Sequence, residues 1–250
     1  MFVHSIYDEF KNSDFKPVLF ELPIAKGGDG GISPFRAQLS DGSDVYIYGQ
    51  IDRVDTYEKD GCVYFRVVDY KTGSKAFKRE DLEKGLNLQM FLYMFSIMEN
   101  KESFCNMADC RGELVPAGVL YYIARLPKSD YDELLSAEDV RNIVIKNIER
   151  QGMLLDDDDI ISSMSKGEED TALPKGITTG LKTNSEDSLF TLESLDEIKN
   201  TITDTLVRIA NGLKTGKADA DPMRDSRSPC EYCRMRVICR HNKEGGTDNE

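Results

Sequence analysis

The sequence predicts an α/β domain with a central mixed β-sheet flanked by helices. Segments 45–55 and 62–70 are rich in β-branched and aromatic residues, which is typical of strands. Asp60-Gly61 between them is a typical hairpin turn. Segments 79–100 and 194–213 instead carry apolar residues at spacings of three and four, which indicates amphipathic helices. Strands and helices mixed in this way along one chain favour an α/β fold.

The remaining segments are assigned by the same patterns. We expect a helix at 2–13, a strand at 17–23, a strand at 117–124 and a helix at 137–150. Residues 155–188 are polar and acidic, which predicts a loop or a weakly ordered insertion. Residues 1–221 would then form one domain, followed by a Cys-containing segment with a polar tail at 222–250. Because the first helix begins abruptly, we expect the chain to be a fragment of a larger protein.

Composition limits the class of protein. The chain has 250 residues, is 40% hydrophobic and carries a net charge of −13. It can therefore bury one sizeable core. No apolar run approaches the ~18 residues that a membrane helix needs, and the N-terminal residues lack the features of a signal peptide. We expect a cytoplasmic protein without a membrane partner.

The acidic charge bears on whether the protein binds nucleic acid. On charge alone, a solvated acidic surface is the simpler interpretation, because phosphate contacts need clustered Lys and Arg. Basic residues nevertheless follow the second strand of the hairpin, at Lys71, Lys75, Lys78, Arg79 and Lys84. A local basic patch therefore stays open, especially beside a divalent cation, which adds positive charge.

The second strand of the hairpin carries an unusual pattern of side chains. Residues two apart share a face of a strand, so an apolar face there leads directly to Asp69 and Lys71. A two-residue turn at Asp60-Gly61 also places Asp52 opposite Asp69, with Cβ atoms roughly 4.5–5.5 Å apart. Two carboxylates so placed repel each other, and a hard cation such as Mg²⁺ relieves that repulsion.

Lys71 completes the chemistry of a phosphodiester-cleaving site. An ammonium beside the cation holds the attacking water and neutralises charge that builds on the phosphate. The cation lowers the pKa of its bound water and polarises the phosphoryl oxygen. The alternative is an ordinary hairpin with a cross-strand ion pair, which is the usual explanation for an isolated Asp-x-Lys. The paired Asp52 and its Gly-Gln-Ile lead-in favour the site.

Three motifs also carry a family resemblance. Gly49-Gln-Ile-Asp-Arg-Val-Asp55, Val67-Val-Asp-Tyr-Lys-Thr-Gly73 and Gln89-Met-Phe-Leu-Tyr93 resemble motifs of RecB-like nucleases in the PD-(D/E)XK superfamily. Together with Pro116-Ala-Gly-Val-Leu-Tyr-Tyr122 and the terminal cysteines, they are similar in order to the C-terminal nuclease domain of the second component of AddAB helicase–nucleases. The resemblance covers nearly the whole chain and implies a restriction-endonuclease-like fold.

The resemblance implies a role for each residue of the site. Asp52, Asp69 and the Tyr70 carbonyl would bind Mg²⁺ or Mn²⁺, and Lys71 would be the catalytic lysine. Gln89 and Tyr93, one helical turn apart, would lie beside them. Without the family, Gln89 is equally well a solvent-facing helix residue. Glu21 is a weaker catalytic candidate, for which a capping or surface role is an alternative. We expect Arg53 and Lys75 to contact DNA.

Cysteines near the C-terminus form a second candidate metal site. Cys230, Cys233 and Cys239 have the spacing C-x2-C-x5-C, which suits Zn²⁺ or an iron–sulfur cluster better than reduced free thiols. From spacing alone, His241 would complete a zinc site. The resemblance implies instead a [4Fe–4S] cluster whose fourth cysteine lies far upstream, before the nuclease motifs. It also implies a metal-binding His on an upstream helix, and His4 is too close to the first strand to match it.

The expected function is therefore that of an Mg²⁺-dependent deoxyribonuclease. By the resemblance it would be an exonuclease domain that acts with a helicase–nuclease A subunit in double-strand break repair and recombination. The alternative is a weak or inactive nuclease-like module that binds DNA or a protein partner and carries a structural metal site.

Overall fold

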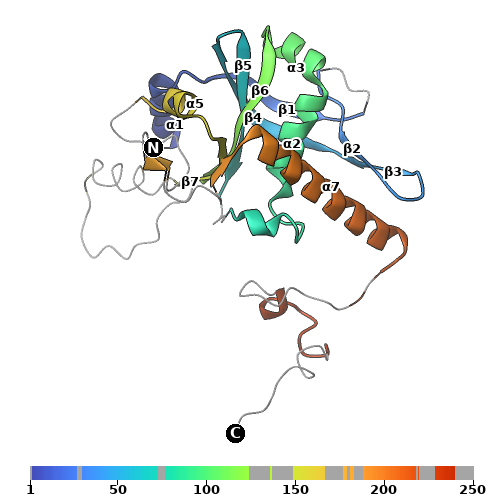
Figure 1. Cartoon of the computed structure of the whole chain (residues 1–250). Helices are drawn as coiled ribbons and strands as arrows, with labels where there is room; N and C mark the ends of the chain where they lie inside the picture. Colours follow the sequence, from blue (N-terminus) through green and yellow to red (C-terminus); the bar gives the residue numbers. More distant parts are fainter. Residues whose placement is uncertain are drawn as a thin grey trace. The chain divides into compact units, whose positions relative to one another are not determined.

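A computed structural model describes most of the chain (Figure 1). The residues that it describes are 2–26, 30–72, 77–123, 136, 149–166, 177–178, 181–182, 188–217, 219 and 229–239. Residues 2–207 belong to one compact unit and residues from 208 onward belong to a second. The expected division at residue 221 stays a prediction. None of the described helices combines the length and apolar character that crossing a membrane requires.

A six-stranded mixed sheet forms the centre of the first unit, in the strand order β1-β4-β5-β6-β7-β10. β1–β4, β4–β5 and β6–β7 pair antiparallel, whereas β5–β6 and β7–β10 pair parallel. The predicted α/β class and mixed sheet are thereby confirmed. The strands are β1 (Lys16–Ile24), β4 (Gly49–Lys59), β5 (Cys62–Lys71), β6 (Glu113–Ile123), β7 (Glu149–Leu155) and β10 (Leu189–Phe190).

The β4–β5 hairpin has the register that its turn predicts. Asp60 and Gly61 both have positive φ angles, 51° and 79°, as a two-residue hairpin turn of this kind requires. Lys59 pairs with Cys62 and the same register continues to Arg53 opposite Val68. Continued by one residue, it places Asp52 opposite Asp69. The two acidic motif residues therefore come to the same end of the hairpin.

Helices cover both faces of the central sheet (Figure 1). Buried apolar residues of the second, third and last helices pack against one face of β5 and form one core with it. On the opposite face, buried residues of the fourth helix and Phe15 form a second core, against which Ile6 of the first helix packs. The helices are α1 (Phe2–Asn12), α2 (Leu88–Glu99), α3 (Lys101–Ala108), α5 (Asp158–Met164) and α7 (Leu192–Lys214).

Shorter elements complete the described part of the chain. Two small hairpin-like sheets lie outside the central sheet, and two single turns have 3₁₀ geometry. These elements are β2 (Phe35–Gln38), β3 (Asp44–Ile47), β8 (Ile177–Thr178), β9 (Leu181–Lys182), η1 (Arg79–Asp81) and η2 (Pro229–Glu231).

Alternation along β5 separates its side chains between the two faces. Val63, Phe65 and Val67 are fully buried in the core beneath α2. Arg66 and Val68 point to the opposite face, where Arg66 contacts α1 and Val68 joins the second core. Because β5 is covered on both sides, its last residues emerge between two layers of helices. Side chains at the end of the strand, such as Asp69, are therefore largely shielded from solvent.

The predicted strand at 45–55 is wrong in extent, because two strands occupy this segment. β3 pairs with β2, whereas β4 pairs with β1 and β5. The division falls at Tyr48, immediately before Gly49. A Cβ atom at Gly49 would lie 2.7 Å from the Tyr93 hydroxyl, so the backbone here passes unusually close to α2. The change of partner sheet thus follows from packing that the local sequence does not reveal, although the glycine marks its place.

The predicted helix at 79–100 begins later than expected. Residues 79–81 form a single 3₁₀ turn, and α2 starts only at Leu88. Asn87 has a left-handed backbone conformation, with φ of 59°, and its side-chain amide donates to the buried Asp81 carboxylate at 3.3 Å. This tertiary contact stabilises a turn where apolar periodicity alone predicted continuous helix.

The segments after residue 137 also differ from the sequence-based expectations. Residues 149 and 150 start β7, and the rest of the predicted helix 137–150 lies outside the described residues. Within 155–188, residues 158–164 form α5, so the predicted loop is wrong there. Asp157 caps this helix by accepting bonds from the backbone N–H groups of residues 159 and 160. The acidic run that suggested a loop is therefore in part a helix cap.

The long last helix was predicted correctly, but its N-terminal cap was not. α7 spans Leu192–Lys214. The Ser194 N–H donates to Thr191 Oγ1 at 3.1 Å, and the Thr191 N–H donates to Ser194 Oγ at 2.9 Å. This reciprocal pair caps the helix one turn earlier than the Ser-x-x-Glu pattern of Ser194 and Glu197, which by itself predicts a capping box between those two residues.

Candidate active site

Asp69 and Lys71 lie at the end of β5, on the face that α2 covers. The Asp69 residue is 1% exposed, although ionised carboxylates are seldom buried without a partner. Lys71 Nζ lies 2.5 Å from Asp69 Oδ2. The Lys71 side chain keeps 31% of its surface exposed. The pair therefore joins a buried carboxylate to an ammonium that still reaches the solvent.

Two residues from the first turns of α2 extend this pair. Gln89 Nε2 donates to Asp69 Oδ1 at 3.1 Å and lies 3.0 Å from the Tyr93 hydroxyl. Lys71 Nζ lies 3.4 Å from Gln89 Oε1, so the amide contacts both charged groups. Gln89 is thus directed toward the sheet rather than only toward solvent. The structure brings together four of the predicted site residues, Asp69, Lys71, Gln89 and Tyr93.

Asp52 reaches the same end of the hairpin by a different contact. Its Oδ2 atom accepts a hydrogen bond from the Tyr70 backbone N–H at 2.8 Å. The Asp52 side chain thereby lies beside β5. The backbone pairing of β4 with β5 ends at Arg53, and this side-chain contact follows it. The bond uses one of its two carboxylate oxygens. Asp52 is attached to the peptide unit that links Asp69 to Tyr70.

Tyr121 is a site residue that the sequence analysis missed. It is fully buried on β6 directly beside Asp69 in the parallel β5–β6 register. Lys71 Nζ lies 5.9 Å from the centre of its ring. Burial, together with the nearby Asp69 carboxylate and Tyr93, raises the pKa of the Tyr121 hydroxyl above its usual value. Tyr121 belongs to the Pro116–Tyr122 motif, to which the sequence analysis assigned no role in the site.

Gly49 controls how closely β4 approaches Tyr93. An added Cβ would lie 2.7 Å from the Tyr93 hydroxyl and 2.8 Å from Cε1, distances at which the ring must shift. Gly49→Ala should therefore displace Tyr93 and its Gln89 partner and reduce any cleavage activity by roughly 10- to 100-fold. Gly212→Ala is the matched control, because a Cβ there meets only Lys217 Cβ at 3.9 Å. Rates measured at saturating cation would contradict the expectation if both variants matched the wild type.

The remaining predicted residues have different outcomes. Glu21 is exposed on β1 with φ of 50°, and its carbonyl accepts from Gln50 Nε2 at 3.3 Å. Its predicted catalytic role stays a prediction. Arg53 is 0% exposed, and its guanidinium is engaged by Glu9, so the expected DNA contact of Arg53 was wrong. Lys75 lies outside the described residues.

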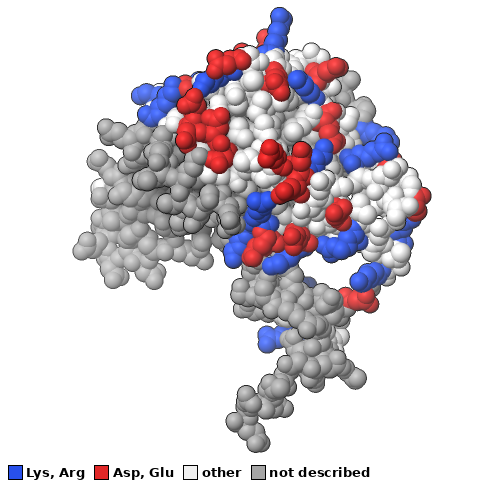
Figure 2. Space-filling model, viewed as in Figure 1, with Lys and Arg blue, Asp and Glu red and all other residues white. Residues whose placement is uncertain are grey.

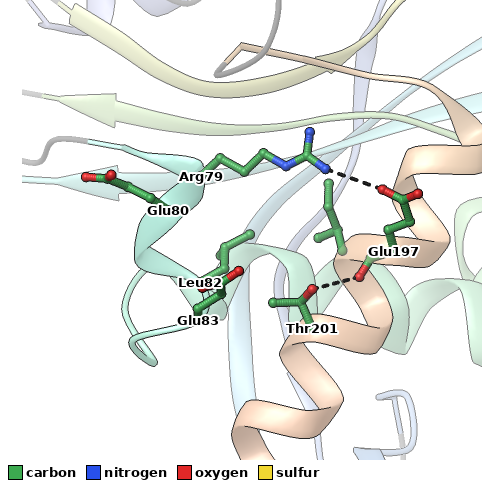
Figure 3. A pocket seen from close by; sticks show the side chains of 7 residues that line it. Arg79, Glu80, Leu82, Glu83, Glu197 and Thr201 are labelled. Carbon is green, nitrogen blue, oxygen red and sulfur yellow. Dashed lines mark hydrogen bonds and ion pairs between the residues drawn. The ribbon is translucent and has the colours of Figure 1, made fainter.

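A hollow of about 570 Å³ opens between η1, the turn after it and α7 (Figure 3). Arg79 and Glu197 face each other across it with a 3.9 Å ion pair. The hollow is lined by Arg79, Glu80, Leu82, Glu83, Glu197, Ile198 and Thr201. Three of these residues are glutamates and one is basic, so the lining does not suit a phosphate. We assign no ligand to it.

The visible surface of the described residues carries charges of both signs (Figure 2). Lysine and arginine side chains are interspersed with aspartate and glutamate on this face, so the described part of it offers no broad positive region. A nucleic acid that approached the described part of this face would therefore meet no broad positive region, and a bound cation would add positive charge locally.

Comparison with known proteins decides the family. The profile of the PD-(D/E)XK nuclease superfamily matches residues 2–240. The chain belongs to this superfamily.

Relatives of the chain within the superfamily are named as the B component of an ATP-dependent helicase/deoxyribonuclease. One from Clostridium acetobutylicum is 32% identical over 242 residues, which is 95% of this chain and 20% of the relative. One from Clostridium perfringens is 28% identical, over 94% of this chain and 20% of the relative. One from Acetivibrio thermocellus is 27% identical, over the same shares. The chain spans about a fifth of the length of these curated relatives.

The candidate site has the donors that a hard divalent cation needs. Asp52 and Asp69 supply carboxylate oxygens, and the Tyr70 carbonyl follows Asp69 directly in β5. Among the described residues there is no group of three or more Asp, Glu, His or Cys side chains arranged for a metal. One or two carboxylates with water and substrate oxygens are nevertheless what Mg²⁺ usually takes. The residues present therefore fit Mg²⁺ or Mn²⁺.

The cysteine segment does not fit a metal group as it stands. Cys230, Cys233 and Cys239 all lie in the described part of the second unit, yet they are not gathered into a metal-holding group there. Cys233 is exposed and the other two are half-buried. His241, the alternative zinc ligand, lies outside the described residues.

Proposed function

We propose that this chain is an Mg²⁺-dependent DNA nuclease domain that hydrolyses phosphodiester bonds. The observation that carries the proposal is the arrangement at the end of the β4–β5 hairpin. There a buried carboxylate, a half-exposed ammonium and an amide from α2 contact one another, and Asp52 is bonded to the adjoining peptide. An ordinary surface ion pair would not bury its carboxylate to 1% exposure or recruit a third residue from another element.

Each residue has a role in this proposal. Asp52, Asp69 and the Tyr70 carbonyl would hold the cation, which would supply a bound water of lowered pKa and polarise the phosphoryl oxygen. Lys71 orients the attacking water and neutralises negative charge on the phosphate. Gln89 fixes the Asp69 carboxylate and the Lys71 ammonium relative to each other. The Tyr93 hydroxyl contacts the Gln89 amide, and Tyr121 lies beside Asp69 on the neighbouring strand.

The biological setting is proposed from the relatives' names. Proteins of that name are components of an ATP-dependent helicase/deoxyribonuclease. We infer that the chain cleaves DNA as an exonuclease, together with a helicase–nuclease A subunit, during double-strand break repair and recombination. Its cytoplasmic location stays a prediction. So does the iron–sulfur cluster, since Cys230, Cys233 and Cys239 lack the arrangement that would support one.

The requirement for the cation is the direct test. End-labelled single-stranded DNA should be shortened by the full chain in Mg²⁺, left intact with EDTA, and shortened again when Mn²⁺ is added in excess. The physical reason is that two carboxylates without a cation repel a phosphate rather than bind it. DNA that is bound equally well with and without Mg²⁺ but never cut would favour the alternative, a nuclease-like binding module.

A further inference from the structure

A cluster of five charged side chains lies on the face of the sheet opposite the active site. Glu9 of α1 accepts from Arg53 NH2 at 2.7 Å and from Arg66 NH2 at 2.9 Å through Oε1. Its Oε2 accepts from Arg150 NH2 at 3.2 Å. Asp55 accepts from Arg66 Nε at 2.8 Å and from Arg53 NH2 at 3.0 Å. The hydrogen bonds of these two carboxylates therefore connect one helix, α1, to three strands, β4, β5 and β7.

The cluster is buried throughout. All five residues are at most 3% exposed. The guanidinium groups also lie over aromatic rings, with Arg53 4.9 Å from the centre of the Phe10 ring. Burial raises the pKa of the Glu9 carboxyl, but the three arginines outweigh it and hold that pKa below the usual 4.5. Arginines from three strands therefore keep the buried Glu9 carboxylate ionised.

The cluster is joined to the active site by a short chain of contacts. Arg53 follows Asp52 in β4, and Tyr70 follows Asp69 in β5, so each pair sends one side chain to either face. Arg53 NH1 donates to the Tyr70 hydroxyl at 2.6 Å. The Tyr70 N–H in turn donates to Asp52 Oδ2 at 2.8 Å. The groups that hold Arg53 and Tyr70 therefore also hold the two backbone positions that carry the proposed metal ligands.

The pairing of β4 with β5 does not reach the acidic pair, although β4 remains paired with β1 and β5 with β6 there. The β4–β5 ladder runs to Arg53 opposite Val68, one residue short of the acidic pair. At that point the Asp52 side chain takes a bond from the backbone of β5. The outer strands hold the two backbones, and side-chain contacts between β4 and β5 set how Asp52 lies relative to Asp69. Those contacts on the far face converge on Glu9.

We propose that Glu9 is a positioning residue for the divalent-cation site, acting through Arg53 and Tyr70 on Asp52 and Asp69. The inference rests on the proposed function, since it concerns the same cation. Glu9 does not touch the cation or the DNA. It sets the geometry of the two carboxylates from α1, which is more than 40 residues away from both Arg53 and Arg66 in the sequence.

Cation binding without DNA tests the proposal. Mn²⁺ is titrated into the full chain, with calorimetry and electron paramagnetic resonance as readouts. Glu9→Gln should weaken binding by about 10-fold, as expected when an outer contact that orients a metal ligand is lost. Tyr70→Phe, which removes only the hydroxyl that Arg53 contacts, should weaken it in the same direction and keeps the test valid if Glu9→Gln does not fold.

Glu99→Gln is the matched control, because Glu99 makes a surface ion pair with Lys199 at 2.8 Å and its side chain is 37% exposed. It should bind Mn²⁺ as the wild type does. Cleavage assays should show a higher Mg²⁺ concentration for half-maximal activity in Glu9→Gln and Tyr70→Phe, with the DNA concentration for half-maximal activity unchanged. A purely structural role would lower the folded fraction without shifting either concentration.

The outcomes separate the two proposals. If the folded Glu9→Gln and Tyr70→Phe variants bind Mn²⁺ as tightly as the wild type, the positioning role is overturned and the nuclease proposal stands. If the wild type itself binds no Mn²⁺ and Asp69→Asn changes nothing, the proposed function fails first. Weaker binding in both variants, with Glu99→Gln unchanged, supports the inference.

Discussion

Lys71→Met should reduce DNA cleavage by about 100- to 1,000-fold while leaving cation binding intact. Lys71 Nζ lies 2.5 Å from Asp69 Oδ2, where it occupies a carboxylate oxygen that the cation would also use. Removing the ammonium therefore frees that oxygen, so Mn²⁺ should bind the variant at least as tightly as the wild type. Cleavage should nevertheless fall, because the charge that neutralises the phosphate is lost. Single-turnover rates at saturating Mg²⁺ and a Mn²⁺ titration measure the two effects.

Two further variants separate Lys71 from the rest of the site. Asp69→Asn removes a proposed ligand and should lose both cation binding and cleavage. Lys59→Met is the lysine control. Lys59 lies on β4 and makes an exposed ion pair with Asp159 at 2.8 Å, so the variant should change neither cation binding nor cleavage. Full cleavage by Lys71→Met would refute the catalytic role of the lysine. Loss of cation binding in the same variant would make Lys71 a structural group.

Asp55→Asn should lower the free energy of unfolding by about 3–5 kcal/mol, the usual result of breaking a buried ion pair from one side. Asp55 is 0% exposed and lies between Arg53 and Arg66. Without its charge, three buried guanidinium groups of the cluster would face the Glu9 carboxylate alone. Their desolvation would then be poorly compensated. Urea unfolding followed by circular dichroism at neutral pH measures the loss.

Controls distinguish charge imbalance from simple loss of a side chain. Asp44→Asn removes a partly exposed ion pair with Arg36 and should leave the unfolding midpoint unchanged within error. Adding Arg66→Met to Asp55→Asn should recover part of the stability, because it removes one uncompensated guanidinium. An Asp55→Asn protein as stable as the wild type would mean that the buried charges are not energetically coupled.

The hairpin shows how much local sequence can decide. The Asp60-Gly61 turn and the β-branched strands set the β4–β5 register, and that register brings Asp52 and Asp69 to one end. Alternation along β5 then places Asp69 and Lys71 on a single face. These features depend on residues close in the chain, so sequence patterns reach them.

Arg53 and Tyr121 show where the sequence analysis failed. Arg53 was expected to contact DNA, yet alternation places its side chain on the opposite face from Asp52, where α1 covers it. That signal was present and was not used. Tyr121 lies beside Asp69 only because β6 pairs in parallel with β5, a pairing between segments about 50 residues apart. No local pattern identifies such a neighbour.

By itself, the sequence determined the α/β class, the hairpin register, the long last helix and the nuclease motifs, because each depends on short-range periodicity or turn chemistry. Only the tertiary structure decided where 45–55 divides, where α2 begins and what lies behind the site. Those features depend on contacts between distant segments, such as Gly49 with Tyr93, Asn87 with Asp81, and Glu9 with three arginines. Burial makes such contacts strong, and burial is a property of the folded chain rather than of any one segment.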